Sequence, residues 1–332
     1  MADGGVGAGG RMAWIRPRAG ERKPVDLKTD QPHTARMYDY FLGGKDNFPA
    51  DREAGQRAMA GAPDIARAIR ANRAFLVRAA RYLAAEAGIR QFLDIGTGIP
   101  TSPNLHEVAQ AITPDARVVY VDNDPLVLAH ARALLTSTPA GRTAYLDADL
   151  RDIDAILAAP ELRDTLDLSQ PVALSVLAIL HFLPDTETGE PFTLVRRLLD
   201  ALPAGSCLVV SHGTPDFAPA ISEQGAAAYR AGGIAVQLRR RDEFARFFDG
   251  LELVDPGIVP VHRWRPDTAP AGAAGATVVP GRTTTVAGTG VDEDGLTEAE
   301  IDDFLADDPS GIATAGLADS QVNMYGAVGR FR

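Results

Sequence analysis

Three carboxylates stand where apolar runs of the sequence end, and their spacing suits recognition of a nucleoside. Asp94 precedes a tight glycine turn, Asp122 follows the next apolar run, and Asp149 follows the third. The first can bind an ammonium, the second can accept both hydroxyls of a ribose, and the third can accept the amino proton of an adenine. Each alone is as readily explained as a solvated loop or helix-capping carboxylate. Together they predict an adenosine site.

The segment FLDIGTGIPT, residues 92–101, predicts a strand that runs into a ligand-binding turn. Gly96 and Gly98 let the backbone approach a ligand closely. A dinucleotide site would place a third glycine at position 101, where this sequence has Thr101, and the charge of Asp94 would repel a pyrophosphate. The pattern therefore favours S-adenosylmethionine over a nicotinamide cofactor, which remains the weaker alternative.

Strands and helices that alternate along the chain must position these residues. The expected strands cover residues 91–95, 117–121, 143–146, 171–177, 206–211, 251–261 and 323–330. Helical patterns cover residues 64–88, 106–112, 125–135, 152–159, 191–202, 218–231 and 241–248. Because parallel strands need crossover helices, this rhythm predicts an α/β fold with a doubly wound sheet covered on both faces. The three carboxylates would then share one edge of the sheet.

Long motifs in the sequence resemble those of one known family. They are ARMYDYFLGGKDNF (35–48), FLDIGTGIPTSPNLHEVAQ (92–110), VVYVDNDPLVLAHARALL (118–135), LDADLRD (146–152) and LHFLPD (180–185). The sequence resembles an actinobacterial family of S-adenosylmethionine-dependent methyltransferases of class I type, formerly a domain of unknown function. The resemblance covers residues 25–267 and the terminal YGAVGR. It implies a Rossmann-like, seven-stranded, mostly parallel sheet with an antiparallel last strand and a cofactor over the glycine loop.

The resemblance also gives a role to residues 35–48, which precede the sheet. They are expected to fold over the cofactor crevice as a lid, and the alternative is a structural turn with aromatic anchors. Leu150 is expected to pack on the adenine ring. The residues expected to contact the cofactor are Tyr38, Gly43, Gly44, Lys45, Asp94, Gly96, Thr97, Gly98, Asp122, Asn123, Asp149 and Leu150.

Two histidines are candidates for a general base, if the methyl acceptor must lose a proton. His181 follows the fourth expected strand and His212 follows the fifth, so both belong to the ligand-binding edge. The alternative is that each histidine is packed in the core or caps a helix. The sequence has no His or Cys pattern with metal-ligand spacing, and a calcium loop over 290–301 is rejected because Gly290 and Ile301 cannot ligate with side chains.

Composition bounds the class of protein. The chain has 332 residues, and its single cysteine, Cys207, excludes an intrachain disulfide, as expected of a cytoplasmic protein. We expect neither a membrane span nor a signal peptide, because the sequence contains neither a long apolar stretch nor the apolar middle of a leader. The formal net charge of −11 argues against binding to nucleic acid. Oligomeric state is not readable.

That charge is concentrated in one segment. Nine of the acidic residues lie between Val291 and Asp308 without a base, so the rest of the chain carries only −2. Five units are expected in all: a flexible arm (1–24), a helical cap or lid (25–90), the methyltransferase core (91–267), an Ala/Gly-rich and acidic insertion with a helix near 297–305 (268–320), and the last strand (321–332).

These features predict S-adenosylmethionine-dependent methyl transfer by in-line displacement, with a small molecule as the acceptor. The identity of the acceptor is not readable from the residues. Two alternatives stay open: a non-catalytic S-adenosylmethionine-binding protein that regulates or contacts a partner through the acidic insertion, and a nicotinamide oxidoreductase.

Overall fold

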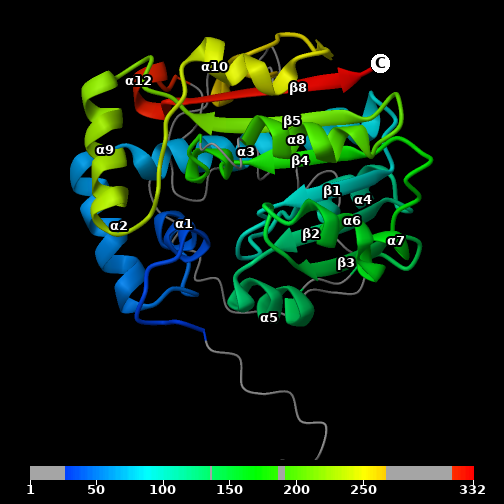
Figure 1. Ribbon diagram of the computed structural model, residues 1–332, viewed down its shortest axis with the longest axis horizontal. Coiled ribbons are helices and arrows are strands. Elements are labelled where there is room, and N and C mark those ends of the chain that lie inside the picture. Colours follow the sequence, from blue (N-terminus) through cyan, green and yellow to red (C-terminus); the bar gives the residue numbers. More distant parts are fainter. Residues whose placement is uncertain (1–26, 135–136, 186–190, 267–315) are drawn as a thin grey trace, which may run out of the picture.

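The computed structural model describes residues 27–134, 137–185, 191–266 and 316–332. The expected arm over 1–24, most of the expected insertion over 268–320, and the helix and rejected calcium loop within it lie outside the described residues. Within the described residues a sheet is flanked by helices on both faces (Figure 1).

The described strands are β1 (Gln91–Ile95), β2 (Arg117–Asp122), β3 (Arg142–Asp147), β4 (Ala173–Leu177), β5 (Cys207–Gly213), β6 (Leu251–Leu253), β7 (Val259–Pro260) and β8 (Met324–Phe331). The described α-helices are α1 (Thr34–Leu42), α2 (Pro49–Gly61), α3 (Ile65–Ala85), α4 (Leu105–Ile112), α5 (Pro125–Leu134), α6 (Ile153–Ala158), α7 (Pro160–Arg163), α8 (Pro191–Asp200), α9 (Pro219–Ala231), α10 (Arg241–Ala245) and α12 (Asp319–Val322). Short 3₁₀ helices are η1 (Leu180–Phe182), η2 (Arg246–Phe248) and η3 (Val261–Arg263).

The strands form one sheet in the order β3-β2-β1-β4-β5-β8-β6, and β7 also pairs with β8. Strands β1 to β5 pair in parallel, whereas β8 runs antiparallel to β5, β6 and β7. The expected doubly wound α/β fold with an antiparallel last strand is confirmed. The strand expected over 251–261 is two short strands, because Pro256 has no N–H to donate and Gly257 turns the chain at a φ of 77°. The sheet therefore has eight strands rather than seven.

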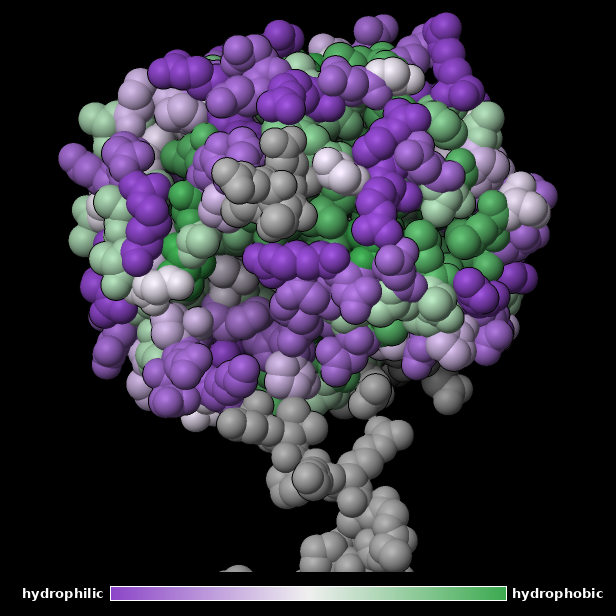
Figure 2. Space-filling view, viewed as in Figure 1, coloured by the Kyte–Doolittle hydropathy of each residue, from purple (hydrophilic) through white to green (hydrophobic). Residues whose placement is uncertain are grey.

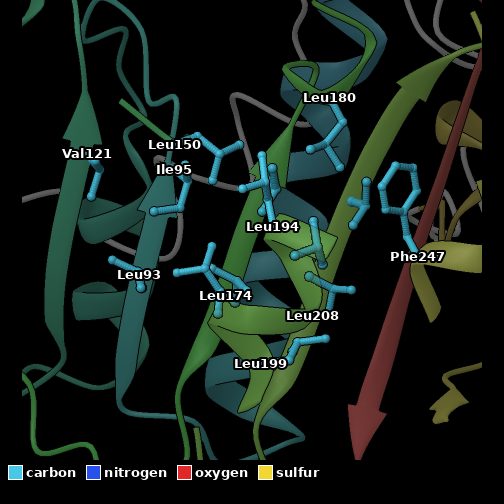
Figure 3. Packing of buried hydrophobic residues seen from close by; sticks show 14 of the residues in the cluster. Leu93, Ile95, Val121, Leu150, Leu174, Leu180, Leu194, Leu199, Leu208 and Phe247 are labelled. Atoms are coloured by element: carbon cyan, nitrogen blue, oxygen red, sulfur yellow. The ribbon is translucent and has the colours of Figure 1, made fainter. Parts of the chain in front are cut away.

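Alternate side chains of the strands build a core on each face of the sheet. Leu93 and Ile95 of β1 pack with residues of α6, α7 and α8, whereas Phe92 packs with α3 and α4 on the opposite face. Figure 3 shows Leu93, Leu174 and Leu208 of neighbouring strands in the first of these cores. Because both faces are covered, the ligand edge of the sheet is left at the carboxyl ends of the parallel strands.

Helices α1, α2 and α9 lie beyond these carboxyl ends and together form what we call the cap (Figure 1). Met37 and Phe41 of α1 pack with Ala54 and Ala58 of α2 in a small core of their own. The contact between α2 and α9 is tight, because a Cβ atom on Gly61 would lie 2.9 Å from the backbone oxygen of Gln224. The N-terminal segment is thus helical, as the resemblance implied.

The face seen in Figure 2 carries hydrophobic side chains in patches separated by hydrophilic ones. No helix among the described residues is both long and apolar enough to cross a membrane. In the same described residues, Ile221 and Leu253 are the large hydrophobic side chains that are exposed, at 40% and 39%. Ile221 lies on α9 in the cap, whereas Leu253 lies on the short strand β6.

Candidate functional site

A cavity of about 390 Å³ lies between the carboxyl ends of the parallel strands and the cap. Its wall takes residues from β1, β2 and β5, from the loops after β3 and β4, and from α1, α3 and α9. Pockets at this edge are the usual ligand sites of open α/β sheets, because the strand order reverses between β1 and β4. Ten of the predicted site residues line it: Tyr38, Asp94, Gly96, Thr97, Gly98, Asp122, Asn123, Asp149, Leu150 and His181.

The glycine turn forms the floor of this cavity. Gly96 and Gly98 adopt φ values of 72° and 69°, which favour glycine. A Cβ atom on Gly96 would lie 2.2 Å from Cδ1 of Ile179, which follows β4, so this position also needs the space that glycine leaves. The amide of Gly96 donates to the carbonyl of Val121 at 2.7 Å and fixes the turn to the end of β2. The turn therefore offers bare backbone to a ligand.

Asp94 lies behind the turn and is 5% exposed. Its Oδ2 accepts a hydrogen bond from the Thr97 hydroxyl at 2.8 Å. Burial raises the pKa of Asp94, while hydrogen bonds from Thr97 and Ser175 and the charge of Arg73 oppose that rise. A carboxyl in this setting is stabilised by a bound cation such as an ammonium.

The end of β2 is tied to the same turn through Asp122. Its Oδ2 accepts the amide of Gly98 at 2.8 Å, and its Oδ1 accepts the amide of Asp124 at 2.9 Å. Burial raises the pKa of Asp122, and these two backbone hydrogen bonds oppose the rise. The carboxyl lines the cavity, where it can accept hydroxyl protons from a ribose.

The loops after β2 and β3 meet at the side of the cavity. Asn123 donates through Nδ2 to Oδ2 of Asp149 at 3.1 Å, and Asp149 forms an ion pair with Arg151 at 3.1 Å. Leu150 is 5% exposed beside them and lines the cavity. This arrangement presents an amide, a carboxylate and an apolar surface together, which suits the edge and face of a planar base.

The cap supplies Tyr38 but leaves three other predicted residues outside the cavity. The hydroxyl of Tyr38 donates to the carbonyl of Ile69 at 3.2 Å and accepts from Nδ2 of Asn72 at 3.1 Å. Gly43, Gly44 and Lys45 do not belong to the described lining.

A separate network accounts for the segment with Gly43 and Gly44. Gly43 ends α1 at a φ of 83°, and the Gly44 amide donates to the carbonyl of Asp39 at 2.9 Å. The Asp39 carboxyl accepts from the Asp46 amide and from Nδ2 of Asn47, and a Cβ atom on Gly44 would lie 1.9 Å from it. The glycines thus serve a compact turn, which was the alternative explanation of this motif. Ala35 and Tyr38 are the residues of this motif that belong to the described lining of the cavity.

His181 lines the cavity between the sheet and the cap. Its Nδ1 accepts the amide of Gly213 at 3.4 Å. Burial and the charge of Arg239 lower the pKa of His181 to about 3. The imidazole is therefore neutral near pH 7, and because Nδ1 accepts, the proton resides on Nε2.

His212 was expected at the ligand-binding edge as a candidate general base, but it does not belong to the described lining of the cavity. It is 1% exposed, with Nδ1 2.7 Å from the carbonyl of Gly213 and Nε2 2.8 Å from Nη1 of Arg239. Burial lowers the pKa of His212, and the nearby His181 and Arg239 lower it further. Since both nitrogens have partners inside the protein, His212 is a packed histidine and not a base for a substrate.

The sequence did not single out Arg239, which holds the wall of the site together. Fully buried, its guanidinium donates to the carbonyls of Leu180 and Leu183 at 3.0 and 2.9 Å and to Asp185 at 2.7 Å. These bonds tie η1, which carries His181, to the loop before α10, and the contact with Nε2 of His212 ties that loop to β5. Arg239 is the first of three consecutive arginines in an arginine-rich sequence, and nothing in that run distinguishes it from its neighbours.

Helix α3 contributes two further polar residues that were not predicted. Asn72 is 3% exposed and Arg73 is partly buried, and both line the cavity. A signal for Asn72 was present, because it lies three residues after Ile69 and three before Phe75, on the apolar stripe of the helix. No group of three potential metal ligands occurs among the described residues.

Comparisons with known proteins agree with this geometry. A model of the S-adenosyl methyltransferase family matches residues 20–293. A crystal structure of a DUF574 family protein from Streptomyces avermitilis is 46% identical, covers 92% of this chain and 100% of that chain, and has a TM-score of 0.77. A structure from Thermobifida fusca, described as a candidate methyltransferase, is 36% identical, covers 92% and 97%, and has a TM-score of 0.72.

A search of curated proteins gave no match. The family model covers more than half of the chain, and both solved relatives are more than 30% identical over nearly the whole of it. The chain therefore belongs to the S-adenosyl methyltransferase family, and its cofactor is S-adenosylmethionine.

Proposed function

We propose that the chain transfers the methyl group of S-adenosylmethionine to a small, uncharged and mainly apolar acceptor bound beneath the cap. The observation that carries this proposal is the division of the cavity into two unlike parts. Carboxylates and bare backbone line the part at the strand ends, whereas most side chains that line the part beneath the cap are aliphatic or aromatic, although Asp64 and Ser222 also lie there.

The part at the strand ends fits the cofactor. Asp94 would hold the ammonium, Asp122 the ribose hydroxyls, and Asp149 with Leu150 the adenine. Beside Gly98 no described atom lies within 4 Å of the position of a Cβ atom, so the backbone there is open to a ligand. When bound, the cofactor supplies an activated methyl group on its sulfonium.

The part beneath the cap is the compartment for the acceptor. Its wall includes Ile65 and Ile69 of α3, Ile221 and Tyr229 of α9, and Phe182 of η1. The rings of Phe182 and Tyr229 are 5.7 Å apart, in the range of aromatic packing. Such a surface favours an apolar or aromatic molecule, because burying a charge against it would be costly.

The size of the cavity favours a small acceptor. Pockets for one drug-sized ligand span roughly 300–1,000 Å³, and this cavity of about 390 Å³ must hold both the cofactor and the acceptor. A cavity of this volume leaves little room for a segment of a macromolecule beside the cofactor. The proposal therefore favours a free small molecule.

Methyl transfer in this cavity needs position more than proton transfer. Neutral His181 would donate from Nε2 to the acceptor and orient it, since a pKa of about 3 makes the imidazole a weak base. The apolar wall would exclude water and hold the acceptor in line with the methyl group, an effect that can lower a barrier by roughly 7–11 kcal/mol in well-oriented systems. The acceptor atom would then be one that is nucleophilic without a protein base.

The experiment is a turnover assay with small aromatic amines, which are neutral and nucleophilic near pH 7, each paired with an analogue that carries a carboxylate. Formation of S-adenosylhomocysteine and the mass of the methylated product are measured. We expect turnover of uncharged members and little of their anionic partners. Selective turnover of anionic acceptors would contradict the proposal, and tight cofactor binding without turnover of any acceptor would favour the non-catalytic alternative.

One exposed isoleucine and one exposed leucine provide a matched pair of variants, one inside the cavity wall and one outside it. Ile221 lines the cavity and is 40% exposed, whereas Leu253 is 39% exposed on β6 and does not line it. Ile221→Asp is expected to raise the KM for an apolar acceptor at least about tenfold, because it places a charge at an apolar wall. Leu253→Asp is expected to leave KM unchanged.

A further inference from the structure

Arg73 on α3 is placed above the end of the glycine turn by two hydrogen bonds. Its Nη2 donates to the carbonyl of Thr101 at 2.5 Å and to the carbonyl of Pro103 at 2.7 Å. The residue lines the cavity. Its Nε is buried without a hydrogen-bond partner among the described residues. A guanidinium offers five N–H donors; the two carbonyls take the hydrogens of Nη2, whereas Nη1 has no hydrogen-bond partner among the described residues.

The charge of Arg73 is also without a counter-charge. In the described part of the chain no carboxylate forms an ion pair with it, whereas Arg151, the other arginine of the lining, pairs with Asp149 at 3.1 Å. Arg73 is close enough to Asp94 and to Tyr38 for its charge to lower the pKa of both groups against the rise caused by burial. A partly buried, unpaired cation next to a ligand site indicates that a ligand brings the anion.

We propose that Arg73 binds the carboxylate of the methionyl end of the cofactor, opposite the ammonium that Asp94 holds. This inference rests on the proposed function only in its use of the cofactor, and not on the acceptor. The methionyl end carries one ammonium and one carboxylate, and the cavity wall presents the carboxylate of Asp94 and the guanidinium of Arg73. Arginine suits a carboxylate because its guanidinium stays charged, and Nη1 of Arg73 can donate a charge-assisted hydrogen bond.

The test compares two ligands that differ only in this carboxylate. S-adenosylmethionine and decarboxylated S-adenosylmethionine are titrated by calorimetry into the wild type, Arg73→Lys and Arg73→Met, with folding checked by circular dichroism. We expect the wild type to bind S-adenosylmethionine about 10- to 100-fold more tightly, the range expected for charge-assisted hydrogen bonds. Arg73→Met should bring this ratio close to one, and Arg73→Lys should leave an intermediate ratio.

Several outcomes would overturn the proposal. If the wild type binds both ligands equally, the carboxylate is not recognised. If Arg73→Met weakens both ligands by the same factor, Arg73 only supports the turn. If Arg73→Met does not fold, the ratio in Arg73→Lys decides, and an unchanged ratio there overturns the proposal.

The surface variant Arg90→Met removes the same charge from an exposed pair with Asp115 and should keep the wild-type ratio. A shift of the ratio in this control as large as that in Arg73→Met would assign the effect to overall charge and overturn the proposal. Failure of the proposed acceptor chemistry would leave the ligand ratio intact, so the two failures are distinguishable.

Discussion

At the scale of single residues, the site depends on how burial treats its two histidines. His181 and His212 have ring centroids 5.4 Å apart, yet one lines the cavity and the other bonds only within the protein. That the two histidines lie close together, near the ends of β4 and β5, could be predicted from the sequence, because parallel strands end at the same edge of the sheet. Which of them faces the ligand depends on Arg239, 27 residues after His212. Sequence spacing alone does not contain that contact.

The lowered pKa of His181 has a consequence for stability. Between pH 6.5 and about 3 the unfolded chain binds a proton at this histidine that the folded chain does not bind. The free energy of unfolding therefore falls as pH drops through this window, by up to about 1.4 kcal/mol per pH unit, and is independent of this group above it. His181→Gln is expected to reduce this slope, as measured by urea unfolding from pH 7.5 to 4.5.

The comparison above pH 7 is the internal control for this prediction. There the wild type and His181→Gln should show the same dependence on pH, whatever their absolute stabilities. An equal slope in both proteins between pH 6 and 4.5 would show that His181 is protonated as easily in the folded chain as in the unfolded chain.

Arg239 and Arg240 are adjacent in sequence and opposite in environment. The side chain of Arg239 is 0% exposed and pairs with Asp185, whereas that of Arg240 is 65% exposed and pairs with Asp216. Arg239→Met is expected to destabilise the fold by about 3–5 kcal/mol, because it strands buried acceptors. Arg240→Met should cost less than about 1 kcal/mol. Equal losses of stability in Arg239→Met and Arg240→Met, measured by denaturant unfolding, would contradict the structural role assigned to Arg239.

At the scale of elements, the strands around the site could be predicted well and the cap poorly. Strand β1 and its glycine turn are encoded locally. The apolar run around Asp94 predicts the strand, and Gly96 and Gly98 adopt the positive φ angles that the turn requires. The orientation of the turn after α1 is not local. Gly44 faces Asp39 because that carboxyl collects donors from Asp46 and Asn47, so a glycine pair that resembles a ligand loop instead closes a turn.

One contact between the cap and the loop after β2 is made by Asp124, which directly precedes α5. Its Oδ2 lies 3.0 Å from Nδ1 of His33 and 3.2 Å from Nε of Arg36, and Asp124 is 1% exposed. Burial raises the pKa of Asp124, but His33, the Leu126 amide and Arg36 outweigh it, so that the pKa lies below its ordinary value. This group thus ties α1 to the end of β2, next to the cofactor site.

Removal of this charge should loosen the cap. Asp124→Asn is expected to lower the free energy of unfolding by about 3 kcal/mol near pH 7, because it leaves the buried Arg36 without one of its counter-charges. Since the folded-state pKa is lowered, the wild type holds this stability above about pH 4 and loses it as pH falls through the folded pKa.

Denaturant unfolding between pH 3 and 7 measures both effects of Asp124→Asn. Asp115→Asn, which breaks an exposed pair, is the control and should change stability by less than about 1 kcal/mol. A constant difference between wild type and Asp124→Asn over the whole range would contradict the lowered pKa.

At the scale of the whole molecule, most of the net negative charge belongs to a segment other than the residues that line the cavity. The nine acids between Val291 and Asp308 lie outside the described residues, and the remainder of the chain is close to neutral at −2. The net charge of −11 therefore says little about the cavity, whose wall mixes carboxylates with arginine and a broad apolar surface. What the cavity selects is decided by these local groups.

Because the cavity is built jointly by the sheet and the cap, its ligand should stabilise both together. A ligand at 100 times its Kd adds about 2.7 kcal/mol to the free energy of unfolding. S-adenosylmethionine and S-adenosylhomocysteine are each expected to raise the temperature of one cooperative transition, measured by calorimetric scanning. NAD should not raise it, because Asp94 repels a pyrophosphate and Thr101 stands where a dinucleotide loop needs its third glycine. Two transitions, of which the ligand shifts one, would instead mean that the cap unfolds independently of the sheet and leaves the cofactor bound to the strand ends alone.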